Sequence, residues 1–397
     1  MEEREVVIVD GCRTPFGKKG GGLKDLAASE LGGICVKALI ERTGLPERGG
    51  KVDSLLAGMA ISEHRSCNTA RYISLYAGLP YETAATFIEM QCGSAITALN
   101  HAAWKIKAGM SEIAVVGGVE AHSNLPVLFP TDMTPYRQTP APLRRHLSPI
   151  PEQDTSMIQN SDKMAARWGV AREACDEFAF RSQMRLQEAY KKGISGPEII
   201  PVTIPGTGAV IEKDEHPRPN ITMEQIAGMK PLFPGGVTTA ANASGVNDGA
   251  AFLLVMTAER AKELGYEPYA RWIGCAHAGI QADYMGVAAS YSNLKAARSL
   301  GLRLSDFDVF ESNEAFAAQQ LAVIKDMQDT TGETIDQEKW NPNGGAIAIG
   351  HPNAASGARI TIFAMKQLER TGGRYGCISS CCGGGQGATA IIENLRR

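Results

Sequence analysis

The sequence lacks a basic excess, a long apolar run and a paired-cysteine framework, and each absence excludes a class of protein. With 40 Lys and Arg against 43 Asp and Glu, it carries no basic face of the kind that binds nucleic acid. No run approaches 18 apolar residues, so we expect no membrane span and no membrane partner. The nine cysteines form no Cys-x-x-Cys pair, which argues against a zinc site and a disulfide scaffold.

The chain also has few aromatic residues and no sign of a secretory signal. The first five residues are acidic and precede only a short apolar run, so we expect a cytoplasmic protein whose thiols are mostly buried and inert. Aromatics make up 6% of the chain, whereas glycines number 43, which indicates tight backbone packing and many turns. A length of 397 residues exceeds what a single core usually supports.

Short apolar runs alternate with longer segments of helical periodicity, which predicts an α/β architecture. The predicted strands are residues 6–9, 113–116, 252–256, 270–275 and 376–380. Predicted helices cover residues 95–108, 170–192 and about 355–372, and a glycine ends each of them. Both ends of the chain repeat the order helix, strand and glycine run, so we predict a duplicated α/β unit.

The middle of the chain breaks this pattern. Residues 121–160 are rich in proline, and Gly/Pro-rich breaks recur at 205–208 and 230–236. We therefore predict an irregular, helix-containing insertion from about residue 121 to residue 242. Long loops inside a domain usually carry function.

Cys92 stands at the predicted start of a helix. The positive end of a helix dipole favours a thiolate, so Cys92 is a candidate nucleophile. The alternative is a buried structural cysteine, since free thiols are among the most buried groups. This segment alone leaves both interpretations open.

Three further segments carry groups suited to acid–base chemistry. His351 follows a run of small residues and could take a proton from a thiol, or could cap a turn. Cys381 and Cys382 precede Gly383, a pattern that suits an oxyanion hole of backbone N–H groups or a simple tight turn. Asn313 follows a predicted strand, where it is either a site residue or a polar helix cap.

Together these segments resemble the thiolase family, in the family's order and over residues 5–395. The matching segments are 13–17 (RTPFG), Cys92, 117–120 (GGVE), 242–250 (NASGVNDGA), 313–316 (NEAF), 344–346 with 350–352 (GGA and GHP) and 381–385 (CCGGG). So many separated motifs at family spacing are very unlikely to arise by chance. The joint pattern therefore favours a functional role for these segments over a purely structural one.

The resemblance implies an α/β fold of duplicated α/β/α units in five layers (αβαβα) with an inserted loop domain. It implies an N-terminal half of residues 1–120 plus about 243–268. The loop domain would span 121–242 and bind CoA, and the C-terminal half would span 269–397.

The resemblance further implies an acyl-CoA C-acyltransferase of fatty acid metabolism or β-oxidation, which reversibly cleaves or condenses a 3-ketoacyl-CoA. Cys92 is the implied nucleophile and His351 its activator. Cys381, not Cys382, is the implied acid/base, because the family has Cys-x-Gly-Gly and Gly383 is the first glycine.

Two oxyanion holes are also implied by the resemblance. One consists of His351 with a water held by Asn313, and the other of the backbone N–H groups of Cys92 and Gly383. Coenzyme A and its acyl thioesters are implied as substrates, with no metal and no permanently bound cofactor. The implied substrate-binding residues are His122, Met157, Ala243, Ser244, Met285 and Phe316.

Several segments depart from the usual family pattern. The departures are Ser94-Ala95 after the nucleophile, Ala121-His122 after Glu120, Ser156 and Ile158 on either side of a retained Met157, residues 287–291, and Ala354 in Asn353-Ala354, where a glycine is usual. All fall on segments expected to line the substrate pocket, whereas the catalytic positions are intact. One interpretation is an acyl group other than the usual short chain, and the other is neutral drift in loops.

Arg137, Arg144, Arg145 and His146 crowd one loop. If they are ordered, they are candidates for the CoA phosphates, or for a carboxylate on the acyl chain. The alternative is a solvated loop whose charges bind no ligand, which is the most common arrangement for such a cluster.

Two other functions compete with a thiolase. A decarboxylating ketoacyl synthase shares the duplicated fold but uses one cysteine and two histidines, whereas Asn313 and a second cysteine occupy the corresponding regions here. A silent acyl-CoA-binding subunit is expected to lose Cys92, His351 or Cys381, and all three are present. We expect a homodimer or homotetramer, and an active enzyme that needs a small partner subunit is a further alternative.

Overall fold

A computed structural model describes residues 4–129 and 142–397 of the chain. The N-terminal half contains β1 (Val6–Arg13), β2 (Gly17–Lys18), α1 (Ala28–Thr43), β3 (Ser54–Gly58), α2 (Thr69–Tyr76), β4 (Ala84–Ile88), α3 (Ser94–Lys107), β5 (Ile113–Ala121), β8 (Asn247–Thr257) and α7 (Ala258–Glu263). The C-terminal half contains β9 (Ala270–Gly279), α8 (Ala288–Ser299), β10 (Phe307–Ser312), α9 (Ala317–Thr331), α10 (Ala346–Ile349), α11 (Ser356–Thr371), β11 (Tyr375–Cys382) and β12 (Gln386–Asn394).

The two halves repeat one strand order, which confirms the predicted duplication. In the first half the order is β1-β8-β5-β3-β4, and in the second it is β9-β12-β11-β10. The first two pairings of each series are antiparallel and the next is parallel. At the outer edge of the first series, β3 pairs in parallel with β4. At the matching edge of the second series, β10 makes only an isolated parallel bridge, from Phe310 to Trp340. Three residue pairs between β1 and β9 join both series into one sheet.

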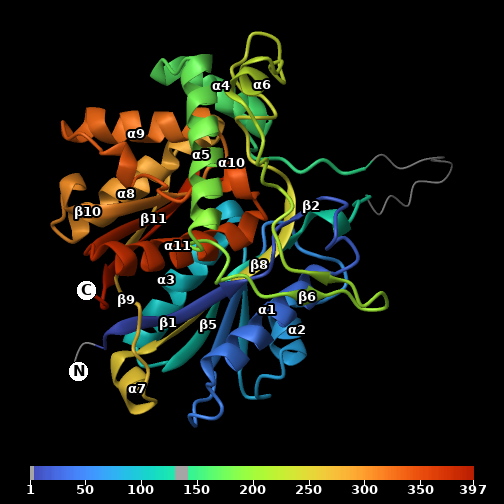
Figure 1. The fold of residues 1–397 in the computed structure, drawn as a ribbon, viewed down its shortest axis with the longest axis vertical. Coiled ribbons are helices and arrows are strands. Elements are labelled where there is room, and N and C mark those ends of the chain that lie inside the picture. The colour runs from blue at the N-terminus through green and yellow to red at the C-terminus, as the bar shows by residue number, and fades with distance from the viewer. Residues whose placement is uncertain (1–3, 130–141) are drawn as a thin grey trace.

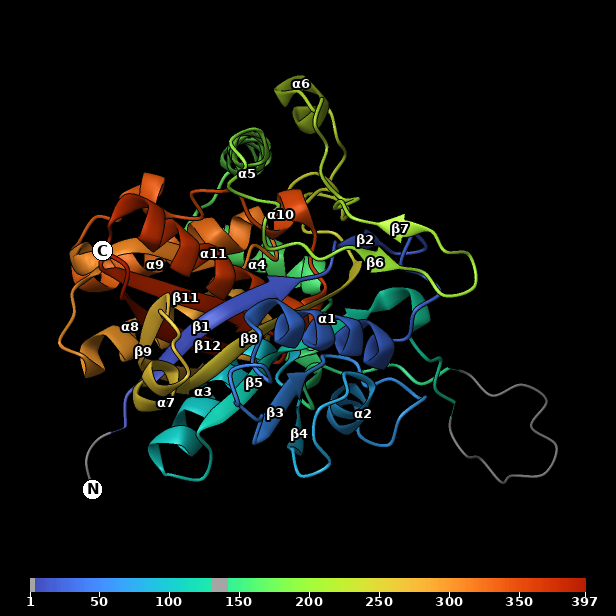
Figure 2. The same cartoon turned by 60° about the horizontal axis from the view of Figure 1, so that its bottom comes forward.

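Helices cover both series and fill the space between them, so the predicted five layers are confirmed (Figures 1 and 2). Helix α3 contacts β3 and β5 on one side and β12 on the other, and α11 contacts β10 and β11 as well as β1 and β8. Both helices therefore lie in the central layer, where their apolar side chains join the largest core cluster. Helices α1 and α2 cover one outer face, and α8 covers the other with α9 packed against it.

The insertion lies between β5 and β8 in the chain. It contains α4 (Met157–Trp168), α5 (Arg172–Lys191), the short strands β6 (Val202–Thr203) and β7 (Val210–Ile211), and α6 (Met223–Ala227). In Figure 2 α5 and α6 stand outside the sheet, and α4 and α5 contact α9 of the C-terminal half. The exact boundaries of the loop domain stay a prediction.

Three features of the described residues concern the thiols, metal binding and membrane-spanning helices. All nine cysteines are free thiols. Within residues 4–129 and 142–397 there is no cluster of His, Cys, Asp and Glu able to hold a metal ion. No helix in the same part of the chain is long and apolar enough to cross a membrane.

Candidate active site

Cys92 lies in a tight turn between the end of β4 and the start of α3, within a short 3-10 helix, η1 (Gln91–Gly93). Gln91 has a φ of 48°, a left-handed conformation that non-glycine residues rarely adopt. The Ser94 hydroxyl braces the turn by donating to the Gln91 carbonyl at 2.7 Å and accepting from the Met90 N–H at 2.9 Å. Strain of this kind, held by surrounding bonds, is typical of a functional residue.

His351 faces the Cys92 sulfur from the other half of the molecule. Its Nε2 lies 3.2 Å from Cys92 Sγ, and its Nδ1 lies 2.6 Å from Ser356 Oγ in the first turn of α11. A donor–acceptor bond at Nδ1 fixes the ring orientation and the tautomer. With Nδ1–H donated to Ser356, Nε2 is left to accept the thiol proton.

Burial keeps both members of this pair neutral in the resting site. It lowers the pKa of His351 to about 3, with His122 and Arg359 acting in the same direction. Burial also raises the pKa of the Cys92 thiol above its usual value, and Cys381 and Glu120 add to the rise. The thiolate expected from the helix N-terminus is therefore not the resting form, because desolvation outweighs the dipole.

The other predicted catalytic residues surround the same point. Cys381 is the penultimate residue of β11, two residues before Gly383, and burial raises the pKa of its thiol to about 12. Asn313 follows β10, is fully buried, and places Nδ2 3.4 Å from His351 Nε2. Among the described residues, the Asn313 Oδ1 atom has no hydrogen-bond partner.

A cavity of about 510 Å³ opens onto these groups. Ten of the eleven predicted site residues line it: Cys92, His122, Met157, Ala243, Ser244, Met285, Phe316, His351, Cys381 and Gly383. Asn313 is not among the lining residues and reaches the site through His351. The structure thus brings together residues from both halves and from the insertion.

The departures from the family pattern divide into two groups. His122 and Ile158 line the cavity, beside the retained Met157. The other departures do not line it: Ser94, Ala95, Ala121, Ser156, residues 287–291 and Ala354. Only the first group can affect the substrate by direct contact.

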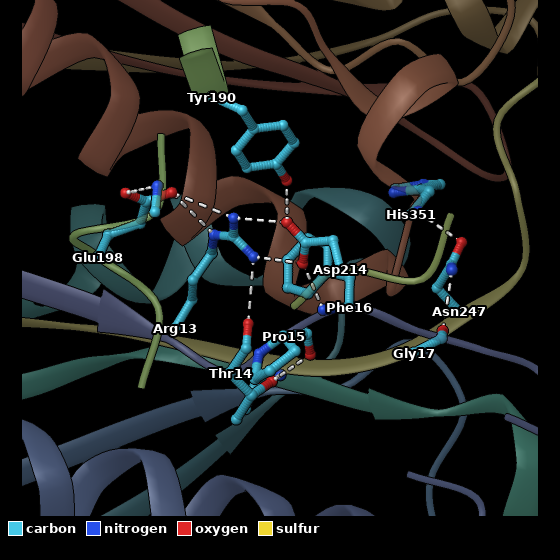
Figure 3. A network of polar contacts seen from close by, with 12 residues as sticks. Arg13, Thr14, Pro15, Phe16, Gly17, Tyr190, Glu198, Asp214, Asn247 and His351 are labelled. Atoms are coloured by element: carbon cyan, nitrogen blue, oxygen red, sulfur yellow. Dashed lines mark hydrogen bonds and ion pairs between the residues drawn. The ribbon is translucent and has the colours of Figure 1, made fainter. Parts of the chain in front are cut away.

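The backbone of His351 is held by Asn247 of the 242–250 motif, which also reaches Gly17 of the 13–17 motif (Figure 3). Asn247 Oδ1 accepts from the His351 N–H at 2.9 Å, and Asn247 Nδ2 donates to the Gly17 carbonyl at 2.8 Å. Gly350 has a φ of 106°, and a Cβ there would lie 2.7 Å from the Asn247 side chain. A glycine is thus required for His351 to reach Asn247.

Arg13 ties the insertion to the same region. Its fully buried guanidinium donates to both Asp214 oxygens, at 2.7 and 2.8 Å, and to Glu198 at 3.1 Å. Asp214 also accepts from the Phe16 N–H at 2.6 Å and from the Tyr190 hydroxyl. Figure 3 shows these groups converging on Asp214. This clamp fixes the segment that carries two cavity-lining residues, His216 and Arg218.

Sequence reasoning missed several cavity residues. His216 and Arg218 lie in the irregular insertion, where no periodicity singles them out. Asn353 directly follows the Gly-His-Pro motif, so a polar side chain at this position could have indicated a site residue. Ser356 sits at the start of α11, where serine is common as a helix cap, and its bond to His351 could not be foreseen.

The described basic residues of the Arg/His-rich loop, residues 144–146, do not line this cavity. Arg144 and His146 both contact Asp154, at 3.1 and 2.6 Å, with largely exposed side chains. Neither these two residues nor Arg145 lines the cavity. This arrangement favours the solvated-loop interpretation for the three residues, while Arg137 lies outside the described residues.

Comparisons with known proteins agree with the geometry. The family descriptions "Thiolase, N-terminal domain" and "Thiolase, C-terminal domain" match residues 6–259 and 266–394. The chain is 39% identical to a beta-ketoadipyl-CoA thiolase of Acinetobacter baylyi and 38% identical to an acetyl-CoA acetyltransferase of Syntrophomonas wolfei, in each case over 99% of this chain and 100% of the relative. A crystal structure of human mitochondrial 3-ketoacyl-CoA thiolase in complex with CoA matches with a TM-score of 0.91 and 33% identity, over 98% of both chains.

Proposed function

Because the chain belongs to the thiolase family and is an acyl-CoA C-acyltransferase, we propose that it cleaves or forms a 3-ketoacyl-CoA through an acyl group carried on Cys92. The observation that carries this proposal is the 3.2 Å contact between Cys92 Sγ and His351 Nε2 at the floor of the cavity. A nucleophile beside a neutral base that is itself oriented by a third group fits covalent catalysis.

In the first half-reaction, the Cys92 proton moves to His351 Nε2 while the sulfur bonds to the carbonyl carbon. The carbonyl oxygen becomes an oxyanion, and collapse of the tetrahedral intermediate breaks the bond to the leaving group, which takes the proton of the Cys381 thiol and leaves Cys381 as a thiolate. The backbone N–H groups of Cys92 and Gly383 are our candidates for stabilising the oxyanion on the acyl group carried by Cys92. Each donor of this kind contributes about 3 kcal/mol to lowering the barrier.

In the second half-reaction, Cys381 acts as the base toward the incoming molecule, which is acetyl-CoA in condensation and CoA in thiolysis. For condensation it removes a proton from the α-carbon of acetyl-CoA, and the carbanion attacks the acyl group on Cys92. For thiolysis it removes the proton of the CoA thiol instead. The enolate oxygen would be held by His351 and by a water on Asn313, whose buried Oδ1 atom has no hydrogen-bond partner among the described residues.

CoA is proposed to enter along the loop domain, residues 121–242 in the predicted division. The cavity wall on that side is formed by Met157, His216 and Arg218 of the insertion, with Ser244 and Phe316 adjoining. The cavity as a whole is mostly apolar, which suits the pantetheine arm, and Arg218 on this wall offers a cation for an anionic group. No metal is needed, because a thioester carbonyl is already activated for attack.

The acyl group is proposed to differ from the usual short chain, because His122 and Ile158 place family departures directly on the cavity. We expect kcat/KM with a longer or polar 3-ketoacyl-CoA, such as 3-ketoadipyl-CoA, to exceed that with acetoacetyl-CoA by about tenfold or more. Steady-state thiolysis over a panel of 3-ketoacyl-CoAs measures this ratio. A wide preference for acetoacetyl-CoA would contradict the proposal and leave neutral drift as the explanation.

We also propose a homodimer that pairs through β4. This strand pairs with β3 on one edge, and no strand of the described residues covers its other edge. Tyr72, Leu75 and Tyr76 of the adjoining helix α2 are exposed apolar side chains. Open edges beside apolar surface favour association. Sedimentation should give at least twice the chain mass of 42.4 kDa, and a stable monomer would contradict the dimer.

Neither alternative function is favoured by the site. A ketoacyl synthase would need a second histidine where Asn313 stands, and a silent subunit would not need the intact Cys92, His351 and Cys381 cluster. Nine free thiols suit a reducing compartment, so a cytoplasmic location is part of the proposal.

A further inference from the structure

Asn353 and His122 form a hydrogen-bonded pair against the sulfur of Cys92. Asn353 opens a short 3-10 helix, η7 (Asn353–Ala355), and its Nδ2 donates to Cys92 Sγ at 3.5 Å. Its Oδ1 lies 2.7 Å from His122 Nε2. His122 directly follows β5, so each half of the molecule contributes one member, 231 residues apart in the chain. Both residues line the cavity.

The direction of the Asn353 amide follows from its neighbours. In the resting site the Cys92 proton is directed at His351 Nε2, which leaves the sulfur as an acceptor on its other side. An amide N–H facing that side is satisfied, whereas an amide oxygen would face sulfur lone pairs. Burial lowers the pKa of His122, so its ring is neutral and its Nε2–H can donate to Asn353 Oδ1. His122 therefore holds the amide in the orientation that suits the sulfur.

The surroundings of Cys92 otherwise oppose a thiolate. The pKa of its thiol is raised by burial, then by Cys381 and Glu120, while the hydrogen bond from Asn353 lowers it. Burial also raises the pKa of Glu120 to about 7, although three backbone N–H groups donate to this carboxyl. The titratable groups around the sulfur are Glu120, His122, His351, Cys381 and Cys382. Asn353 thus supplies a donor where the neighbouring charges would disfavour the anion.

We propose that Asn353 is a further catalytic residue, which donates to the Cys92 sulfur whenever that sulfur is a thiolate, and that His122 is its positioning residue. The proposal rests on the nucleophilic role of Cys92 given above. The thiolate arises twice in the cycle, when the thiol proton has moved to His351 and when the acyl group leaves. A hydrogen bond to an anion is about twice as strong as one to a neutral group, so the bond favours the charged forms selectively.

The test is the rate at which iodoacetamide alkylates Cys92 as a function of pH, followed by mass on the peptide that contains Cys92. In Asn353→Leu, which keeps the volume and removes the donor, we expect the rate at neutral pH to fall about tenfold and the pH midpoint to rise by about one unit. At a pH well above the midpoint the variant should regain the wild-type rate, which a misfolded site would not do. An unchanged midpoint would overturn the proposal.

Two further variants separate the roles. Asn353→Asp is nearly isosteric but presents an anion to the sulfur, so its pH midpoint should rise beyond that of Asn353→Leu. A wild-type midpoint in this variant would overturn the catalytic role of Asn353.

His122→Phe should raise the pH midpoint only while Asn353 is present. The double variant should therefore match Asn353→Leu alone, and additive shifts would overturn the positioning role. Alkylation needs no acyl transfer, so the outcome is independent of whether any acyl-CoA is turned over.

Discussion

Replacing Cys92 with serine is expected to lower kcat for thiolysis by about 10⁴-fold or more, since removing a catalytic nucleophile has effects of this order. A serine hydroxyl is far less acidic than a thiol, and the His351 beside it has a pKa lowered by burial to about 3. A base this weak can assist a thiol but not an alcohol. Stopped-flow or steady-state thiolysis of a 3-ketoacyl-CoA measures the change.

The Cys92→Ser protein should still bind CoA, because its side chain is close in size and the cavity wall on the insertion is untouched. Calorimetric titration with CoA provides this control. A variant that keeps a tenth of the wild-type kcat would contradict the assignment of Cys92 as the nucleophile. Loss of CoA binding along with activity would indicate a collapsed site instead.

Replacing Cys381 with alanine is expected to separate the two half-reactions. Acyl transfer to Cys92 should proceed, whereas condensation should fall by about 10³-fold, as expected for loss of a general acid or base. The variant should therefore accumulate acyl-enzyme when given a simple acyl-CoA. Intact-protein mass after rapid mixing detects the accumulated adduct.

Cys382→Ala is the matched control, one residue away. Cys382 is fully buried and does not line the cavity. A Cβ on Gly93 would lie 2.4 Å from its sulfur, so Cys382 packs beneath the nucleophile turn. Its removal should cost about 1 kcal/mol of stability through a small cavity and leave turnover within a few-fold. The reverse pattern, with Cys381 dispensable and Cys382 essential, would contradict the assignment.

The fold was largely predictable because its local signals are strong and agree with one another. The helix predicted for residues 170–192 is α5 (Arg172–Lys191), and the strand predicted for 376–380 is the centre of β11 (Tyr375–Cys382). Gly109, Gly193 and Gly372, which follow predicted helices, all have φ between 65° and 74°. Periodicity cannot predict how β1 and β9 join the two halves, because three residue pairs carry no pattern of their own.

The grouping of Cys92, His351 and Cys381 around one cavity was predictable, because each sits in a short motif that keeps its spacing. The contacts between distant segments were not. Arg13 reaches Asp214 across 201 residues, and Asn353 reaches His122 across 231. Each of these partners is an ordinary polar residue in its local sequence, and only the folded chain brings them together.

The charge state of Cys92 was the point on which sequence reasoning was wrong. The helix N-terminus predicted a stabilised thiolate, whereas burial of the thiol, with Cys381 and Glu120 nearby, raises its pKa instead. A helix end supplies a partial charge, but desolvation acts on the full charge of the sulfur. The structure therefore favours a neutral resting thiol at Cys92 over a standing anion.

The measurement that tests the central claim most directly is the intact mass of the protein after brief incubation with acyl-CoAs and 3-ketoacyl-CoAs, followed by peptide mapping. The account predicts a gain of one acyl group, located on Cys92, that disappears when CoA is added. No adduct with any member of the panel in a folded, CoA-binding protein, or an adduct on another residue, would contradict a covalent mechanism through Cys92.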